Sequence, residues 1–348
     1  MYKHAYGALL GAACGDAAGA TLEFYNGKIT KTAAKHAMTM PGGGCLGVGP
    51  GQITDDTELA LALAAGLFKF NPVDGFPKES VLKSYIKWYK SKPFDIGNTI
   101  RNAFDNSQNK KDNIYSQANG ALMRITPLSI WCCRLDINTP NIVDKIAEMA
   151  RQDALLSHPS PECQDCNAIY CIAQYYLIHN IDPMPIIEKY VTTSVNPNVQ
   201  KWFLMDSQLP YLEIAKTVKI NIGWVRHGFV LAFHFLRNKT SYEEAILQTL
   251  LCGGDTDTNA CIVGGLIGSL GSGGIPKYMK EPVLKFDCTA VDIITTSAVF
   301  GLIDMLSGKQ NPSVNNKQTG YTEDGFKRPK EYSTCNLKRI VKRLFIAQ

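Results

Sequence analysis

The chain has 348 residues and a formal net charge of +5, with 45% hydrophobic and 19% charged residues. This composition is typical of a folded domain, and no apolar run is long enough to predict a membrane span. From Lys309 onward nine Lys and Arg oppose three Asp and Glu, a net of +6 that leaves −1 on the first 308 residues. The main part of the chain therefore gives no electrostatic indication of nucleic-acid binding.

The first residues do not resemble a signal peptide, because their apolar stretch is short and is soon followed by Asp16 and Glu23. The 11 cysteines are an odd number scattered through apolar segments. The C-x-x-C pair of Cys163 and Cys166 lacks the second pair of ligands that a structural zinc site needs. We expect free thiols, a reducing compartment such as the cytoplasm, and a monomer.

Apolar residues recur at helical spacing along the chain, while alternating, strand-like runs are scarce. We predict an all-α fold, a single large helical domain with a dozen helices or more. The predicted helices with the clearest pattern are 57–70, 79–89, 141–156, 167–178, 224–236, 242–251 and 291–306.

Two glycine-rich segments each allow two interpretations. The small residues of 15–19 either permit close helix packing or contact a ligand. Segment 41–51 (PGGGCLGVGPG) is either a mobile surface loop or a backbone that approaches a ligand closely. Because 41–51 directly precedes an acidic cluster, we favour the ligand interpretation there.

The end of the chain differs in composition from the rest. Residues 307–333 are polar, which indicates a linker, and 336–345 (NLKRIVKRLF) have the spacing of a short basic amphipathic helix. We therefore predict a main domain, 1–308, and a polar, basic C-terminal tail, 309–348. We expect the tail helix to pack back on the domain, with docking to a membrane surface or a partner as the alternative.

Two acidic clusters, TDDT at 54–57 and DTDT at 255–258, each stand before a predicted helix. Helix capping explains one Asp or Thr, but not two carboxylates side by side, which repel unless a cation lies between them. With oxygen donors and no Cys or His inside the clusters, Mg²⁺, Mn²⁺ or Ca²⁺ is favoured over zinc. The set is large enough for two ions, as in two-metal hydrolases: Thr54, Asp55, Asp56, Asp255, Asp257 and Thr258.

These residues belong to an ordered series of motifs that resembles the ADP-ribosylglycohydrolase family, which includes ADP-ribosylarginine hydrolases and the dinitrogenase reductase-activating glycohydrolase. Several motifs in the right order are much more specific than one. The series is GAACGDAAGATLE at 11–23, GQITDDT at 51–57, FDIGNT at 94–99, NGALMR at 119–124, SHP at 157–159, GWVRH at 223–227 and GGDTDT at 253–258.

The resemblance implies an all-α fold with a central cleft that holds two Mg²⁺ ions, with Mn²⁺ as the alternative, on the six residues named above. It implies contacts of Asn119, Gly120 and His158 with ADP-ribose, and it places Asp95 near the leaving group. The family's usual Gly-Asn-Gly is here Ala-Asn-Gly, and its usual Thr-His is Ser157-His158. For each residue a plainer role remains open: His158 as a structural residue, Asp95 as a helix cap, and Glu23 as a surface acid.

The activity implied is hydrolysis of the N- or O-glycosidic bond between ADP-ribose and a modified acceptor, either a protein or a small ADP-ribosyl compound, by metal-activated water. Glu23, Asp55, Asp56 and Asp257 form the expected catalytic set, with Glu23 as the candidate general acid. Asp95 suits a cationic guanidinium leaving group, which favours the arginine linkage.

Two other functions fit the same residues. A dinuclear phosphohydrolase acting on a nucleotide would use a similar ligand set, but it would release phosphate and not ADP-ribose. A non-catalytic, ADP-ribose-binding or crystallin-like member of the family would be indicated by lost metal ligands, whereas all six are present here.

Overall fold

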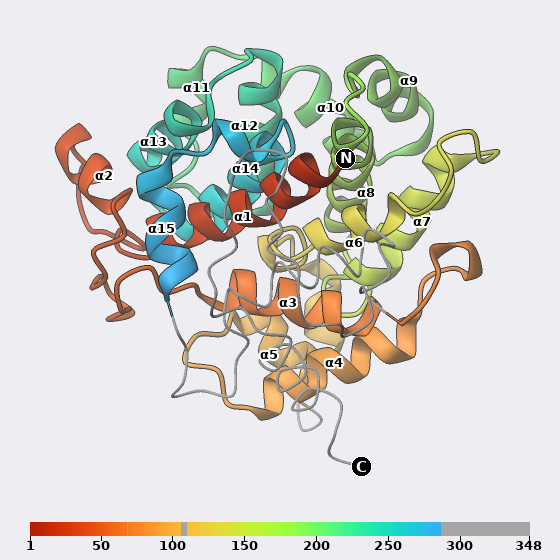
Figure 1. Ribbon diagram of the computed structural model, residues 1–348, viewed down its shortest axis with the longest axis horizontal. Helices are drawn as coiled ribbons and strands as arrows, with labels where there is room; N and C mark the ends of the chain where they lie inside the picture. Colours follow the sequence, from red (N-terminus) through yellow and green to blue (C-terminus); the bar gives the residue numbers. More distant parts are fainter. Residues whose placement is uncertain (68, 106–109, 287–348) are drawn as a thin grey trace, which may run out of the picture.

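The computed structural model describes residues 1–67, 69–105 and 110–286 of the chain. These residues form fifteen α-helices and five short 3₁₀ helices, and they contain no strand (Figure 1). The prediction of an all-α fold with a dozen helices or more is confirmed. None of the described helices combines the length and the apolar character needed to cross a bilayer.

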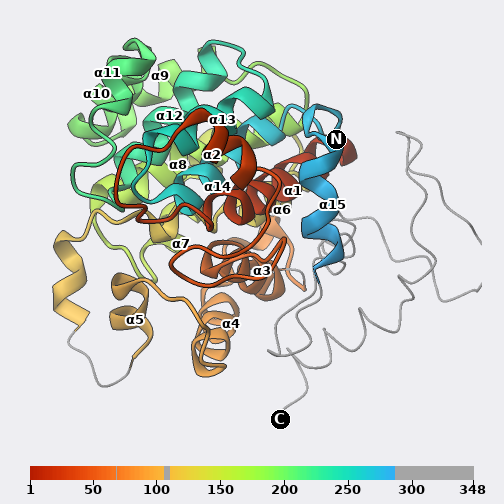
Figure 2. The same cartoon turned by 90° about the vertical axis from the view of Figure 1, so that its left-hand side faces the viewer.

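The α-helices follow one another along the chain and surround a central group of α1, α3 and α14 (Figures 1 and 2). Their bounds are α1 Tyr2–Gly19, α2 Lys31–Ala37, α3 Asp55–Leu67, α4 Lys78–Lys90, α5 Asn98–Phe104, α6 Thr126–Cys132, α7 Ile142–Ala154, α8 Pro161–Ile178, α9 Met184–Ser194, α10 Pro197–Leu204, α11 Tyr211–Ala215, α12 Val225–Arg237, α13 Tyr242–Cys252, α14 Thr256–Gly268 and α15 Lys277–Lys285.

Six of the seven helices predicted from periodicity are present as α3, α4, α7, α8, α12 and α13. The main difference is α8, which begins at Pro161 and not at 167, because proline is favoured in the first turn of a helix. The predicted helix 291–306, the linker 307–333 and the basic helix 336–345 lie outside the described residues. The domain division after residue 308 therefore stays a prediction.

The glycines of α1 allow its backbone to lie directly against the backbone of α14. A Cβ atom added to Gly11 would lie 2.4 Å from the carbonyl oxygen of Gly264, and one added to Gly15 would lie 2.0 Å from that of Ala260. At Gly19 the added atom would lie 2.3 Å from the Cα of Asp257. These glycines therefore serve helix packing, and this packing brings the end of α1 against the start of α14.

Gly15→Ala is expected to lower the free energy of unfolding by about 1–3 kcal/mol, because the new methyl group must push α1 and α14 apart. Urea unfolding followed by circular dichroism measures the effect. Gly273→Ala is the matched control, since an added Cβ there meets no atom within 4 Å. Equal stability of the two variants would contradict the packing role assigned to Gly15.

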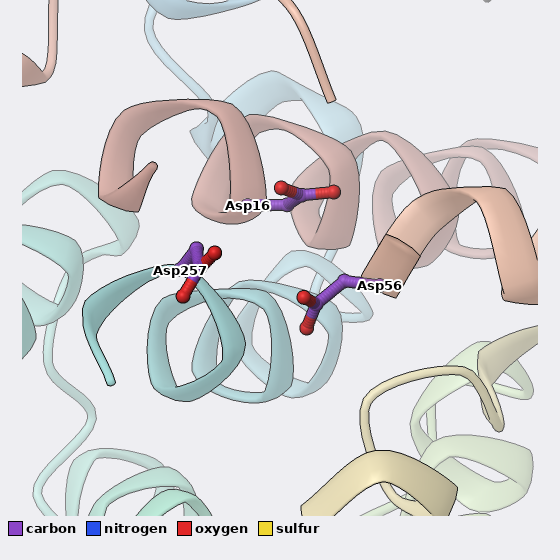
Figure 3. Close-up of side chains that lie close together, drawn as sticks. All are labelled: Asp16, Asp56 and Asp257. Carbon is purple, nitrogen blue, oxygen red and sulfur yellow. The ribbon is translucent and has the colours of Figure 1, made fainter. Parts of the chain in front are cut away.

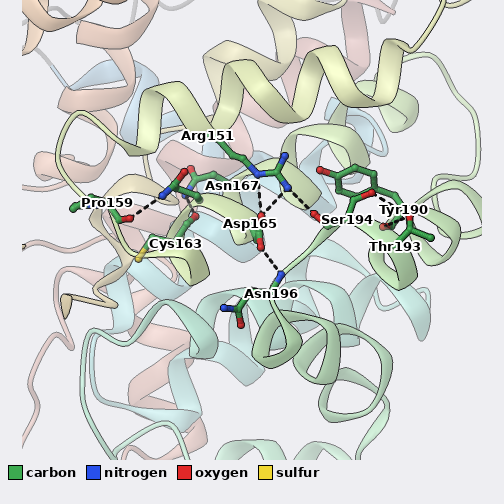
Figure 4. Close-up of polar contacts among 10 residues, drawn as sticks. Arg151, Pro159, Cys163, Asp165, Asn167, Tyr190, Thr193, Ser194 and Asn196 are labelled. Carbon is green, nitrogen blue, oxygen red and sulfur yellow. Dashed lines mark hydrogen bonds and ion pairs between the residues drawn. The ribbon is translucent and has the colours of Figure 1, made fainter. Parts of the chain in front are cut away.

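An ion pair joins α7 to α8 near the loop between them (Figure 4). Arg151 on α7 donates from Nε and Nη2 to Oδ1 of Asp165 on α8, at 2.9 and 2.7 Å. The other oxygen of this carboxylate accepts from the backbone N–H of Asn196 at 2.6 Å. Within the loop, Pro159 O accepts from the side-chain amide of Gln164 at 2.7 Å. The backbone of the loop is therefore anchored, which bears on His158 within it.

Candidate functional site

Three carboxylates from three helices meet where α1 ends and where α3 and α14 begin (Figure 3). Asp16 comes from α1, Asp56 from α3 and Asp257 from α14, and all three are buried. One oxygen from each lies within 4.8 Å of the others, which is a spacing that could hold a metal ion. The two acidic clusters, about 200 positions apart in the sequence, therefore form one site in the fold.

A second group of carboxylates shares Asp257 with the first. Oxygens of Glu23, Asp255 and Asp257 also lie within 4.8 Å of one another, and all three residues are buried. Glu23 follows α1, while Asp255 precedes α14, so the close packing of these two helices brings them together. The two groups together offer oxygen donors for two neighbouring cations.

Asp16 is the residue of this site that the sequence analysis did not assign. Its Oδ1 lies 2.9 Å from Thr54 Oγ1, and its Oδ2 accepts from the backbone N–H and the hydroxyl of Thr57 at 3.2 and 2.5 Å. The backbone N–H of Thr54 lies 3.1 Å from both oxygens. One signal was available, since Asp16 is a single acid within the apolar run GAACGDAAGA.

The hydroxyls of Thr54 and Thr258 both lie near Asp56. Thr54 Oγ1 is 3.0 Å and Thr258 Oγ1 is 3.4 Å from Asp56 Oδ2. The other oxygen, Asp56 Oδ1, is buried and has no hydrogen-bond partner among the described residues. A buried carboxylate oxygen without a partner carries a desolvation cost that a bound cation would offset.

Helix capping does not account for Asp255. This residue occupies the N-cap position of α14, but its side chain makes no capping hydrogen bond. Its Oδ2 accepts instead from the side-chain amide of Asn119 at 2.7 Å. Helix capping therefore does not explain the second acidic cluster, and the carboxylate of Asp255 is held toward Asn119.

Burial and mutual repulsion raise the pKa of several acids of the site. Burial raises the pKa of Asp55, Asp56 and Asp257 well above the usual range, and neighbouring carboxylates add to the effect. Burial, with Asp255 as the next cause, raises the pKa of Glu23 to about 8. The ion pairs between described residues involve none of these acids. The site therefore gathers negative charge that positive charge from outside would stabilise.

Asp95 joins the site from the segment before α5. The backbone N–H of Gly97 donates to Asp55 Oδ2 at 3.2 Å, which ties this segment to the start of α3. Partial burial raises the pKa of Asp95, while hydrogen bonding with the side chain of Asp55 acts against this increase. Asp95 does not cap α5, whose N-cap residue is Gly97.

The three residues expected to contact ADP-ribose adjoin the acidic groups. Asn119 and Gly120 lie in the 3₁₀ helix η3 (Asn119–Ala121), and Asn119 reaches Asp255 as described above. A Cβ atom added to Gly120 would lie 3.0 Å from Cε1 and 3.1 Å from Nε2 of His158. The fold thus places every candidate residue of the sequence analysis in one region.

The glycine-rich segment 41–51 packs against its own chain and reaches Glu23. Gly44 has a φ of +72°, and an added Cβ would lie 2.6 Å from the carbonyl oxygen of Ala20. The thiol of Cys45 lies 3.4 Å from the backbone oxygen of Glu23 and 3.8 Å from its Oε2. Backbone packing therefore explains Gly44 without a ligand, while the segment as a whole lies beside the acidic site.

Comparisons with known proteins bear on the family and the fold of this chain. The sequence model of a family described as ADP-ribosylglycohydrolase matches residues 1–310. The "Putative ADP-ribosyl glycohydrolase" of Acanthamoeba polyphaga mimivirus is 31% identical over 305 residues, which cover 81% of this chain and 91% of that protein. The "ADP-ribosyl-[dinitrogen reductase] glycohydrolase" of Rhodospirillum rubrum is 28% identical and covers 77% and 86%, respectively.

A further relative is the "ADP-ribosylarginine hydrolase Tri1" of Serratia proteamaculans (strain 568), which is 28% identical over 81% of this chain and 75% of that protein. A solved structure described as an "ADP-ribosylglycohydrolase-related protein complex" matches with a TM-score of 0.69 at 22% identity. The match covers 88% of this chain and 98% of that chain, and at this identity it supports the fold.

Proposed function

The chain belongs to the ADP-ribosylglycohydrolase family, and from this premise we propose that it hydrolyses the glycosidic bond between ADP-ribose and a modified acceptor. The observation that carries the proposal is the meeting of Asp16, Asp56 and Asp257 with Glu23 and Asp255 beside the segment of Asn119. Relatives named for dinitrogen reductase and for arginine linkages support a protein substrate.

The donor set fits divalent cations of the magnesium type. All of its atoms are oxygens, the charge is negative, and Asp56 Oδ1 lacks a partner among the described residues. We propose two Mg²⁺ ions, with Mn²⁺ as the alternative, held by Thr54, Asp55, Asp56, Asp255, Asp257 and Thr258. When bound, these ions would supply Lewis-acid chemistry and make a water nucleophile available near neutral pH.

The protein's own side chains supply the other parts of the reaction. Glu23, with a pKa raised to about 8, can hold a proton near neutral pH and donate it to the leaving group. Asp95, half-buried beside Asp55, offers a carboxylate that can pair with a departing guanidinium. Asn119 holds Asp255 in one orientation through its amide. Of these residues, Asp95 favours the arginine linkage over the serine linkage.

The test compares an ADP-ribosyl-arginine protein with an ADP-ribosyl-serine peptide, with and without Mg²⁺, and quantifies free ADP-ribose and phosphate by mass spectrometry. We expect Mg²⁺-dependent release of ADP-ribose, faster from arginine. Asp95→Asn is expected to slow the arginine reaction by about tenfold or more, because the neutral amide no longer pairs with the guanidinium.

The matched control is Asp136→Asn, an exposed aspartate outside the site, which should behave as the unchanged protein. Release of phosphate in place of ADP-ribose would identify a phosphohydrolase. If the folded, metal-loaded protein released no product from either substrate, the proposed hydrolase function would be wrong and a binding role would take its place.

A further inference from the structure

A fully buried arginine, Arg124, contacts the Asn119–Gly120 segment. Among the described residues it forms an ion pair with Asp153, which is not one of the acids of the candidate site. Arg124 donates from Nε to Asp153 Oδ2 at 3.2 Å and from Nη2 to the backbone oxygen of Asp153 at 3.1 Å. Tyr85 donates its hydroxyl to Asp153 Oδ1 at 2.7 Å, and its ring lies under the guanidinium, 4.4 Å from the centroid. Both carboxylate oxygens of Asp153 therefore have a donor, and the guanidinium of Arg124 is held on several sides.

The remaining donor of Arg124 reaches toward the site. Nη1 donates to Ser157 Oγ at 2.8 Å and lies 3.3 Å from the backbone oxygen of Gly120. Ser157 Oγ in turn lies 2.8 Å from Nδ1 of His158. Arg124 thus links η3, which carries Gly120, to the loop between α7 and α8, which carries His158.

The hydrogen bonds among Arg124, Ser157 and His158 determine which ring nitrogen of His158 carries the proton. A guanidinium can only donate, so Ser157 Oγ must accept from Arg124. The described partners of Ser157 Oγ are Arg124 Nη1 and His158 Nδ1, so its single proton finds an acceptor when Nδ1 is unprotonated. A proton on Nδ1 would leave the serine hydroxyl without an acceptor in a buried place, which costs free energy. The hydrogen bonds therefore favour a proton on Nε2.

His158 stays neutral in this setting. The residue is fully buried, and burial, together with the charge of Arg124, lowers the pKa of its imidazole well below the usual value. The neutral ring then has an Nε2–H donor. This nitrogen is buried, has no hydrogen-bond partner among the described residues, and lies against Gly120. An added Cβ at Gly120 would lie 3.1 Å from Nε2, so a larger residue there would press on the imidazole edge.

We propose that Arg124 and Ser157 are positioning residues that hold His158 as a neutral Nε2–H donor, directed at Gly120, for an acceptor oxygen of bound ADP-ribose. The identity of the ligand rests on the proposed function, whereas the protonation pattern of His158 does not. A buried N–H without a partner, on a ring that two other residues hold in place, is expected where a bound ligand accepts its hydrogen bond. Leaving such a donor unpaired would cost free energy.

The test uses the full-length protein with ¹⁵N-labelled histidines, observed by long-range ¹H–¹⁵N NMR. His158→Gln identifies the His158 signals among the six histidines. We expect Nε2 at the protonated shift and Nδ1 at the unprotonated shift, displaced by an accepted hydrogen bond. In Ser157→Ala, the Nδ1 signal should move to the chemical shift of an unprotonated nitrogen that accepts no hydrogen bond. Ser157→Thr, which keeps the hydroxyl, should restore the original spectrum.

Calorimetric titration with ADP-ribose tests the second half of the proposal. Binding should shift the Nε2 signal, and Ser157→Ala should weaken the affinity about five- to tenfold, the usual effect of one hydrogen bond, while Ser157→Thr should not. A proton on Nδ1 of the ligand-free protein, or an Nδ1 signal that ignores Ser157→Ala, overturns the positioning role. ADP-ribose that binds without moving Nε2 overturns the donor role.

The two proposals fail in different ways. If ADP-ribose does not bind at all, the proposed function and the donor role of His158 are both wrong, while the ligand-free spectrum still decides the role of Arg124 and Ser157. Ser157 is the residue to change because Arg124→Ala would leave the buried carboxylate of Asp153 unpaired and is expected to unfold the protein.

Discussion

Asp257→Asn is expected to lower the rate of ADP-ribose release on the order of a thousandfold, more than the 10- to 100-fold that changes next to a metal ligand typically cause. Asp257 is the carboxylate that both groups of the site share, with Asp16 and Asp56 on one side and Glu23 and Asp255 on the other. Losing its charge therefore removes a donor from both groups at once, and it also removes one of the proposed Mg²⁺ ligands. Initial rates at saturating Mg²⁺ measure the effect.

The same substitution should not unfold the protein. Asp257 is buried with a pKa well above the usual range, so removing its charge relieves repulsion in the metal-free state. We therefore expect an unfolding temperature equal to or above that of the unchanged protein in chelator, and weaker Mg²⁺ binding by calorimetry. Asp136→Asn serves again as the control. Full activity of Asp257→Asn at saturating Mg²⁺ would rule out the proposed site.

Removal of divalent ions is expected to abolish hydrolysis. It should also lower the unfolding temperature, and this decrease should become larger as the pH rises. Burial raises the folded-state pKa of Glu23 and Glu58 from 4.5 to about 8, and that of Asp16 from 3.8 to about 6. Between the unfolded and folded pKa values the native state binds more protons than the unfolded chain. The free energy of unfolding therefore falls as the pH rises, by up to about 1.4 kcal/mol per pH unit for each such group.

Bound Mg²⁺ should reverse this trend, because it favours the ionised carboxylates and competes with protons for them. Thermal unfolding from pH 5 to pH 8, in chelator and in Mg²⁺, measures both slopes. Glu58→Gln is the matched control: Glu58 lies outside the proposed ligand set, and its Oε2 accepts from the indole N–H of Trp88 at 2.8 Å. That variant should flatten the slope in chelator and keep the response to Mg²⁺. Metal-free protein with undiminished activity would contradict the metal requirement.

The sequence predicted the properties that depend on the type of a single residue or on the regular spacing of apolar residues. Oxygen donors without Cys or His indicate hard cations, and this holds whatever fold the chain adopts. Helices such as α4 and α7 bury one face and leave another less buried, so their apolar spacing predicted them within a few residues. The uniformly buried α1 has no such stripe, and periodicity did not single it out.

Other features depended on which segments meet in three dimensions. The role of Asp16 became visible only when α1 lay beside α3, where Thr54 and Thr57 donate to its carboxylate. Asn119 could be assigned to Asp255 only because the 3₁₀ helix η3 lies next to the start of α14. No sequence pattern records such contacts, since the partners are 38 to 136 positions apart.

The donor chemistry of the candidate site was therefore determined by the sequence itself, because the oxygen-donor type of Asp55, Asp56, Asp255 and Asp257 does not depend on their neighbours. The assembly of these acids into one site was decided by the tertiary structure. Its physical basis is the contact of α1 with α14, where Gly11, Gly15 and Gly264 leave no side chain between the backbones. That short distance places Asp16 and Glu23 within reach of Asp257, and it turns two separate acidic motifs into one centre.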